Sequence, residues 1–312
     1  MNEQPNVGIK DPNVRNNVSI LVRWTPPESM GSQKSKSSPG LDDEVTKTDP
    51  RTFNIMVDCG KSVYRAIMEY FPTLNVRSID SLIITHEHAD AMMGLDDLRD
   101  LQEFEKVYGE DKTRHVGYRL KGQSSDDITA GGMRVLSSKR CIASALVKFD
   151  YLSSRNAKFV EGYPGVQKTL YPRIAFEAKD DEAYVNLHGL GVQFFPVWHG
   201  KNYSSLGFAF GVTESSTSTK ATFVYISDVS DFPDVTIKRL EQWSIGTLVI
   251  DCLSKYSHAT HLDYNGACKW IRHFAPKKAY LVGMSCSLEH TTTNEQLQKD
   301  FKDSSIDVAM AY

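Results

Sequence analysis

The sequence is informative first through what it lacks. Its 312 residues contain no apolar run long enough to span a bilayer, and the first residues lack the apolar core of a secretory signal peptide. The five cysteines are scattered, and no two of them have the CxxC spacing of a cysteine-based zinc finger. These absences predict a soluble protein of a reducing compartment, the cytoplasm in the first place and the nucleus as the alternative.

An excess of positive charge is also missing. The formal net charge is -3 at pH 7 and the isoelectric point is near 6.3. We therefore expect a small-molecule substrate, with nucleic acid as a less favoured partner that would need a local basic patch, and no membrane partner. The glycines of residues 188–191, HGLG, lack the spacing of a dinucleotide fingerprint, so no nucleotide cofactor is predicted. An oligomeric state is not predicted.

The organisation of the chain favours a single domain over residues 1–312, since 40% of its residues are hydrophobic and can form a substantial core. Residues 25–50 are rich in Pro, Ser, Gly and charge, which predicts a mobile loop. Residues 151–182 are predicted to be an irregular insertion that carries more Lys and Arg than Asp and Glu in the part before RIAFEA, residues 173–178.

Apolar periodicity predicts more strands than helices. Residues 17–23, 52–58 and 81–85 have strand patterns, and leucines at helical spacing predict a helix over residues 94–107 whose apolar stripe belongs to the core. Strands come in runs early in each half, with helices after them. This order favours sheets packed between helical layers over a doubly wound sheet.

The stretch SLIITHEHAD, residues 81–90, places histidines and a carboxylate on alternate positions behind a strand. In an extended segment, side chains two residues apart point to the same side, so His86, His88 and Asp90 can converge on one point. These ligands suit zinc, manganese or iron. The zincin motif HExxH is excluded because its second histidine position is Asp90. The alternative is a polar loop that holds two histidines by chance.

Further ligands must come from elsewhere in the chain. His199 follows the apolar run FFPVW, and Asp228 follows FVYIS. Taken alone, each is ambiguous, because a histidine after a strand is as often a structural group and a Ser-Asp pair is often a turn. Their common position at strand ends favours a shared edge with the first motif.

These motifs, with GLDDLR at residues 94–99, HATHL at 258–262 and GMSCSLEH at 283–290, resemble the metallo-β-lactamase superfamily. They are similar to its branch containing the phosphoribosyl cyclic phosphodiesterase and, more distantly, the transfer-RNA 3′-processing endonucleases. The resemblance covers roughly residues 17–312. It implies an α/β fold, the four-layer αββα sandwich, with a metal site along one edge of the two sheets. The Gly-rich strand with which the superfamily usually opens is not evident before residue 17, which would weaken the first sheet.

The resemblance also implies roles for individual residues. The first metal position corresponds to His86, His88 and His199, the bridging carboxylate to Asp228, and a second-metal ligand to Asp90. Two histidines expected at the second position are replaced by Ala91 and Gly283. Possible substitute ligands are Cys286 and His290, although His290 equally fits a solvated helix start. We therefore expect one tightly bound divalent transition metal, Zn, Mn or Fe, with a weak or absent second.

The predicted chemistry is hydrolysis. A metal with an open position lowers the pKa of its bound water from about 15.7 toward 7, which makes hydroxide available at neutral pH. Asp90 could then orient that water or act as a general base. By resemblance, His261 would lie near the leaving group and protonate it, with His258 a weaker candidate; the alternative for His261 is a neighbour of a helix N-cap.

The favoured function is that of a phosphodiesterase acting on a small cyclic or nucleotide-like phosphodiester. Two alternatives stay open. The same fold opens lactones and thioesters, and no residue above selects phosphorus over carbon. The loss of ligands at Ala91 and Gly283 could also indicate a retired catalyst that now binds metal and a partner.

Overall fold

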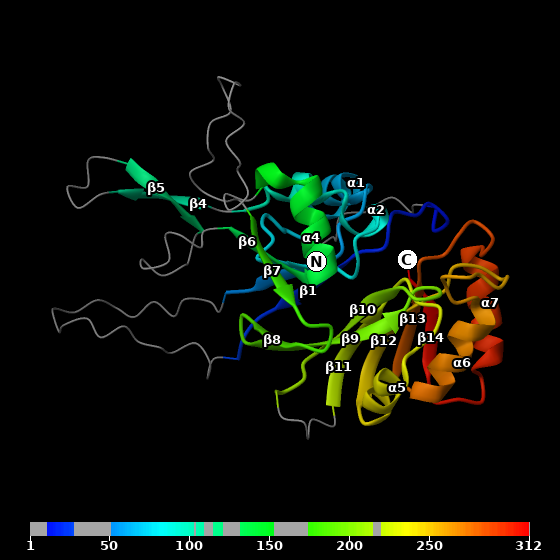
Figure 1. Cartoon of the computed structure of the whole chain (residues 1–312). Coiled ribbons are helices and arrows are strands. Elements are labelled where there is room, and N and C mark those ends of the chain that lie inside the picture. The colour runs from blue at the N-terminus through cyan, green and yellow to red at the C-terminus, as the bar shows by residue number, and fades with distance from the viewer. Residues whose placement is uncertain are drawn as a thin grey trace, which may run out of the picture.

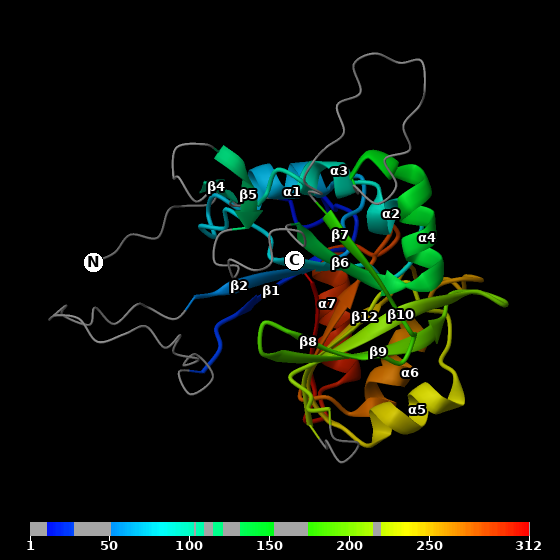
Figure 2. The same cartoon turned by 60° about the vertical axis from the view of Figure 1, so that its left-hand side comes forward.

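Two β-sheets packed face to face form the centre of the molecule, and helices cover both outer faces (Figures 1 and 2). The structure is a computed structural model that describes residues 11–27, 51–102, 132–152, 174–214 and 220–311, with the backbone of residues 104–108 and 115–120. The predicted αββα sandwich of α/β class is confirmed.

The first sheet runs through the N-terminal half. In spatial order it consists of β1 (Ile20–Trp24), β2 (Phe53–Val57), β3 (Ser81–Ile83), β6 (Met133–Ser138) and β7 (Ile174–Lys179). Strand β1 is antiparallel to β2, and the other neighbours are parallel. The outer face is covered by α1 (Val63–Tyr70) and α4 (Lys139–Lys148), the latter capped by the Ser138 hydroxyl. The carboxyl ends of β2 and β3 therefore open at one edge.

The second sheet is larger. In spatial order it consists of β14 (Asp307–Met310), β13 (Lys278–Val282), β12 (Ser244–Asp251), β11 (Lys220–Ile226), β10 (Ser204–Phe210), β9 (Leu190–Trp198) and β8 (Tyr184–Leu187). Strands β11 to β14 are parallel. The outer face is covered by α5 (Asp234–Glu241), α6 (Tyr264–Phe274) and α7 (His290–Asp300).

Three buried apolar clusters match the layers. One fills the space between the sheets, with Ile55, Phe194 and Phe208 fully buried, and one lies between each sheet and its helices. This arrangement follows from the strand patterns: a strand buried on both faces has few polar residues in its interior, and β10 carries only Leu, Gly, Phe and Ala over residues 206–210. The two sheets act as a rigid frame whose shared edge carries the polar strand ends.

The predicted helix over residues 94–107 is wrong. The structure has two short helices, α2 (Ala89–Met92) and α3 (Leu95–Leu98), followed by β4 (Phe104–Tyr108), which pairs with β5 (His115–Leu120). Leu95 and Leu98 are fully buried, as the core stripe predicts. Beyond them the aromatic and β-branched residues of β4 favour a strand, and pairing with β5 outweighs the helical spacing.

The predicted irregular insertion over residues 151–182 is also partly wrong. Residues 150–152 form a single 3-10 turn, and Ile174–Lys179 is strand β7, because these residues pair in parallel register with β6. Residues 153–173 lie outside the described residues, as do residues 28–50 of the predicted mobile loop. Within the described part of the chain, no helix has the length and apolar character needed to cross a membrane.

Candidate metal centre

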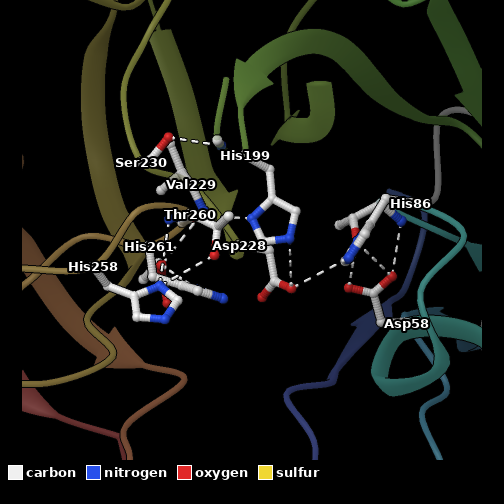
Figure 3. A network of polar contacts seen from close by, with 12 residues as sticks. Asp58, His86, His199, Asp228, Val229, Ser230, His258, Thr260 and His261 are labelled. Atoms are coloured by element: carbon white, nitrogen blue, oxygen red, sulfur yellow. Dashed lines mark hydrogen bonds and ion pairs between the residues drawn. The ribbon is translucent and has the colours of Figure 1, made fainter. Parts of the chain in front are cut away.

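Polar side chains from both sheets meet where strands end. Thr85 and His86 follow β3, His199 follows β9, and Asp228 follows β11. Figure 3 shows the Asp228 carboxylate between the two histidine rings, with His261 on the side away from His86. Because each group sits just beyond a strand of the rigid sandwich, its position is set by the two sheets.

Three imidazoles converge at this edge. The nitrogens of His86, His88 and His199 that could bind a metal lie within 4.8 Å of one another. Ring centroids are 4.5 Å apart for His86 and His88, and 5.0 Å for His86 and His199. His86 and His199 are buried, at 1% and 5% exposure, whereas His88 is exposed. The three imidazoles predicted to form the first metal position therefore lie together, with one side open to solvent.

Hydrogen bonds orient the buried rings. The Thr85 hydroxyl donates to the buried Asp58 carboxylate at 3.0 Å, which leaves its oxygen to accept from Nδ1 of His86 at 2.9 Å. Nδ1 of His199 donates to the Thr260 carbonyl at 2.8 Å. Both rings then turn Nε2 toward the cluster, and Nε2 of His86 is buried without a hydrogen-bond partner. A metal ion fits these donors, because outer partners of this kind hold metal-binding imidazoles in most sites.

Burial keeps the two inner imidazoles neutral. It lowers the pKa of His86 well below the usual range, and the neighbouring His199 and His88 lower it further. Burial likewise lowers the pKa of His199 to about 4. A neutral imidazole offers a lone pair without releasing a proton first, so both rings are ready to bind metal near pH 7.

Asp228 joins the histidines. Its Oδ2 lies 3.3 Å from Nε2 of His86 and 3.9 Å from Nε2 of His199. Its backbone has a φ of +50°, a left-handed conformation that Asp tolerates better than most residues. Burial and the nearby Asp251 raise the pKa of Asp228 to about 7. A cation at the site would offset this cost of burying the charge.

Asp90 reaches the site differently from the predicted geometry. The extended segment ends at His88, and Asp90 lies in the first turn of α2. It still comes within 4.8 Å of the ligand atoms of His86 and Asp228, and it is exposed. The turn at Asp90 packs directly against Gly60. Any side chain at Gly60 would push this turn away, because a Cβ there would lie 1.8 Å from the Asp90 carbonyl oxygen.

His261 lies at the site and not merely beside a helix cap. Its Nδ1 bonds to Oδ2 of Asp251 at 2.9 Å, and its ligand atom lies within 4.8 Å of those of His199 and Asp228. Burial works against a charged His261, but the Asp251 carboxylate outweighs it and raises the pKa of His261. His258 is exposed, and its Nδ1 accepts hydrogen bonds from Thr260, so it serves the local turn.

At the predicted second metal position the structure places Ala91 and Gly283 where the resemblance implies imidazoles. Ala91 and Gly283 line one cavity with Asp90 and Asp228, which is where the sequence places two missing histidines. Among the described residues, the groups of ligand atoms within 4.8 Å include neither Cys286 nor His290, the proposed substitutes. His290 instead begins α7, where its ring is 3.3 Å from the side-chain nitrogen of Asn294.

Sequence reasoning missed three residues of the site. Asp58 follows β2 and Asp251 ends β12, so both share the strand-end position that pointed to Asp228, and that signal could have found them. Tyr203 had no such signal, because it lies in a turn between two strands. Its ring stacks on His88, with centroids 5.0 Å apart and 14° between planes, and the Arg140 guanidinium lies 4.1 Å from its centroid.

The Tyr203 ring is expected to hold the exposed His88 ring in place for metal binding. Tyr203→Ala should free the His88 ring, and metal affinity should fall roughly 10–100-fold, as it does when outer partners of ligands are lost. Tyr203→Phe keeps the ring against His88 and should retain the affinity. Competition with a chelator of known affinity measures both. Equal affinities for the alanine and phenylalanine variants would show that stacking does not hold His88.

Comparisons with known proteins agree with this fold. A sequence model of the beta-lactamase superfamily domain matches residues 151–284, and one of the anti-Pycsar protein Apyc1 matches residues 45–139. A search of curated proteins gives no match. A solved diphosphatase of the PhnP family is 20% identical, with a TM-score of 0.57 over 93% of this chain and 94% of its own.

Two further solved structures are similar. YhfI from Bacillus subtilis, a metallo-beta-lactamase fold protein, is 16% identical, with a TM-score of 0.51 over 83% of this chain and 84% of its own. The short form of human tRNase Z is 14% identical, with a TM-score of 0.47 over 83% of this chain and 85% of its own. The fold and the strand-end site define a metallo-β-lactamase architecture. The match of residues 151–284 to the superfamily model and the shared fold agree with the resemblance that the motifs show.

Proposed function

We propose that this chain is a metal-dependent phosphodiesterase that hydrolyses a small cyclic or nucleotide-like phosphodiester. The observation that carries the proposal is the juxtaposition of three metal-binding imidazoles with His261, whose ring is held by a buried carboxylate on the far side of Asp228. A binding protein has no need of a proton donor beside its metal ligands. The diphosphatase of the same fold offers a precedent for phosphorus chemistry in this architecture.

The residues of the site have two kinds of role, metal binding and proton transfer. A divalent transition metal held by His86, His88, His199 and Asp228 would supply a Lewis acid and a nucleophile at neutral pH. Asp90, exposed at the rim, accepts a hydrogen bond from the attacking water and orients it. His261 donates a proton from Nε2 to the departing oxygen.

Asp251 prepares His261 for this role. It accepts the Nδ1 proton at 2.9 Å, which fixes the ring and favours its protonated form. A protonated ring can donate to an alkoxide leaving group, which is a poor leaving group without a proton. Asp251 is fully buried at the end of β12, so water does not compete for this hydrogen bond.

The intact first position predicts the metal content. Protein purified without added metal should hold about one tightly bound transition metal per chain, because that position offers four ligands while the second keeps only Asp90 and the shared Asp228. Elemental analysis after dialysis measures this ratio. Two equally tight transition metals would contradict the expectation, and so would protein without any bound metal.

The substrate class is tested by parallel assays on one preparation. We expect hydrolysis of a bis-aryl phosphate and of cyclic nucleotides to exceed that of lactone and thioester substrates at equal concentration. His273→Ala serves as the matched control, because His273 lies on α6 and pairs with Glu241 away from the site. Turnover confined to lactones or thioesters would replace the proposal with the carbon-ester alternative, and bound metal without any turnover would favour a binding role.

A further inference from the structure

Glu87 lies between His86 and His88 in the first motif, and the proposed function gives it no role. Among the described residues, the groups of ligand atoms within 4.8 Å do not include Glu87. Its side chain contacts helix α4 instead, where Nε of Arg140 lies 2.9 Å from Oε1 of Glu87. From the other end of α4, Nζ of Lys148 donates to the Glu87 carbonyl at 2.9 Å. Helix α4 therefore holds both the side chain and the backbone of the residue between the two histidines.

Arg140 also reaches the second sheet. Its Nη2 donates to the carbonyl of Ser204, the first residue of β10, at 2.6 Å. Its guanidinium carbon lies 4.1 Å from the centroid of the Tyr203 ring. The ion pair with Glu87 and the hydrogen bond to Ser204 thus fix the guanidinium while it lies over the ring. Arginine suits this arrangement, because its planar group pairs with carboxylates and stacks on aromatic faces.

The Tyr203 ring connects Arg140 to a candidate metal ligand. It stacks on the His88 ring, with centroids 5.0 Å apart and 14° between the planes. The main chain of Tyr203 is held beside the site, because its carbonyl accepts from the backbone amide of His199 at 2.9 Å. Hydrogen bonds orient the rings of His86 and His199, but within the described part of the chain none is formed by the His88 ring. The orientation of His88 therefore depends on its ring contacts.

We propose that Arg140 is a positioning residue of the metal centre, which acts on His88 through the Tyr203 ring. Glu87 and the Ser204 carbonyl hold the guanidinium, the guanidinium holds Tyr203, and Tyr203 holds the exposed ligand. A ligand that is held in place before the metal arrives loses less freedom on binding, so the metal binds more tightly. The inference goes beyond the proposed function, because it concerns metal binding and applies whatever the substrate is.

The charge of Arg140 by itself has the opposite effect on metal binding. A positive charge near the site repels a metal cation, so removal of the charge alone would raise the affinity. The Arg140 side chain is 47% exposed, and solvent and salt screen the repulsion, so the affinity could also stay unchanged. A positioning role predicts a loss of affinity instead. The sign of the change therefore separates the two effects.

The first test measures the zinc affinity of Arg140→Ala by competition with a chelator. We expect the affinity to fall about tenfold or more, the scale on which outer partners of metal ligands act. Arg134→Ala is the matched control and should keep the affinity. Arg134 pairs with Glu177 near the start of β6, at the edge of the sheet opposite the metal centre. Circular dichroism verifies the fold, and Arg140→Met, which keeps the apolar stem, replaces an alanine variant that fails to fold.

A double-mutant cycle tests whether Arg140 acts through Tyr203. In the Tyr203→Ala background, Arg140→Ala should cause little further loss of affinity, because the ring through which it acts is already absent. Cobalt-loaded protein gives a second readout, since the visible absorption bands of Co²⁺ depend on the positions of its ligands. We expect Arg140→Ala and Tyr203→Ala to shift these bands in the same direction, and Arg134→Ala to keep the spectrum of the unmodified protein.

The outcomes keep this inference separate from the proposed function. An unchanged or higher zinc affinity of Arg140→Ala would overturn the inference, and so would an equal loss of affinity with and without the Tyr203 ring. Both results are independent of turnover. Unmodified protein that binds zinc but does not hydrolyse phosphodiesters would overturn the proposed function, and the zinc affinities of the variants would still decide the role of Arg140.

Discussion

Replacing His199 with alanine is expected to remove the metal and the hydrolytic activity together. His199 is buried, and Nε2 is the atom it turns to the cluster, because Nδ1 is occupied by the Thr260 carbonyl. Loss of a direct ligand should lower metal affinity by more than the roughly 10–100-fold that loss of an outer partner costs. Asp228→Ala should behave in the same way, since its carboxylate contacts two of the imidazoles.

The measurement pairs elemental analysis with turnover on a bis-aryl phosphate, and circular dichroism verifies the fold. His273→Ala, a histidine variant on the outer helix α6, should keep both metal and turnover. A His199→Ala protein that retains a full equivalent of metal and normal turnover would show that the three-histidine cluster is not the working site.

His261→Ala should give a different result. The metal should stay, because the three imidazoles and Asp228 remain. Turnover should fall about 10²–10⁴-fold for substrates with poor leaving groups, the range typical of a lost general acid. A good leaving group departs without a proton, so its hydrolysis should fall much less.

A series of aryl and alkyl phosphodiesters whose leaving groups differ in pKa provides the test. The neighbouring His258→Ala is the control, because His258 is exposed and its Nδ1 bonds within its own turn. An equal loss of turnover across the whole series would make His261 a positioning residue. A loss of metal with turnover would make it a ligand.

The fold and the first metal position could be largely predicted from local sequence patterns. Apolar runs of strand length and the polar residues just after them are local features, so His86, His199 and Asp228 could be found as candidates from local patterns, although His199 and Asp228 were each ambiguous until they were taken together. The helix predicted over residues 94–107 failed for the opposite reason. Its leucine spacing is local, but strand β4 exists through pairing with β5, which local spacing does not encode.

The sequence by itself determined which candidate ligands this chain has: three histidines and two aspartates are present, and the resemblance implies imidazoles where the chain has Ala91 and Gly283. Only the tertiary structure decided what stands in their place. His261 is tied to Asp251, ten residues earlier in the chain, and the other oxygen of that carboxylate faces Gly283 from a neighbouring strand. Such contacts arise when the ends of paired strands meet at one edge, and no local pattern specifies which carboxylate is left there without a partner.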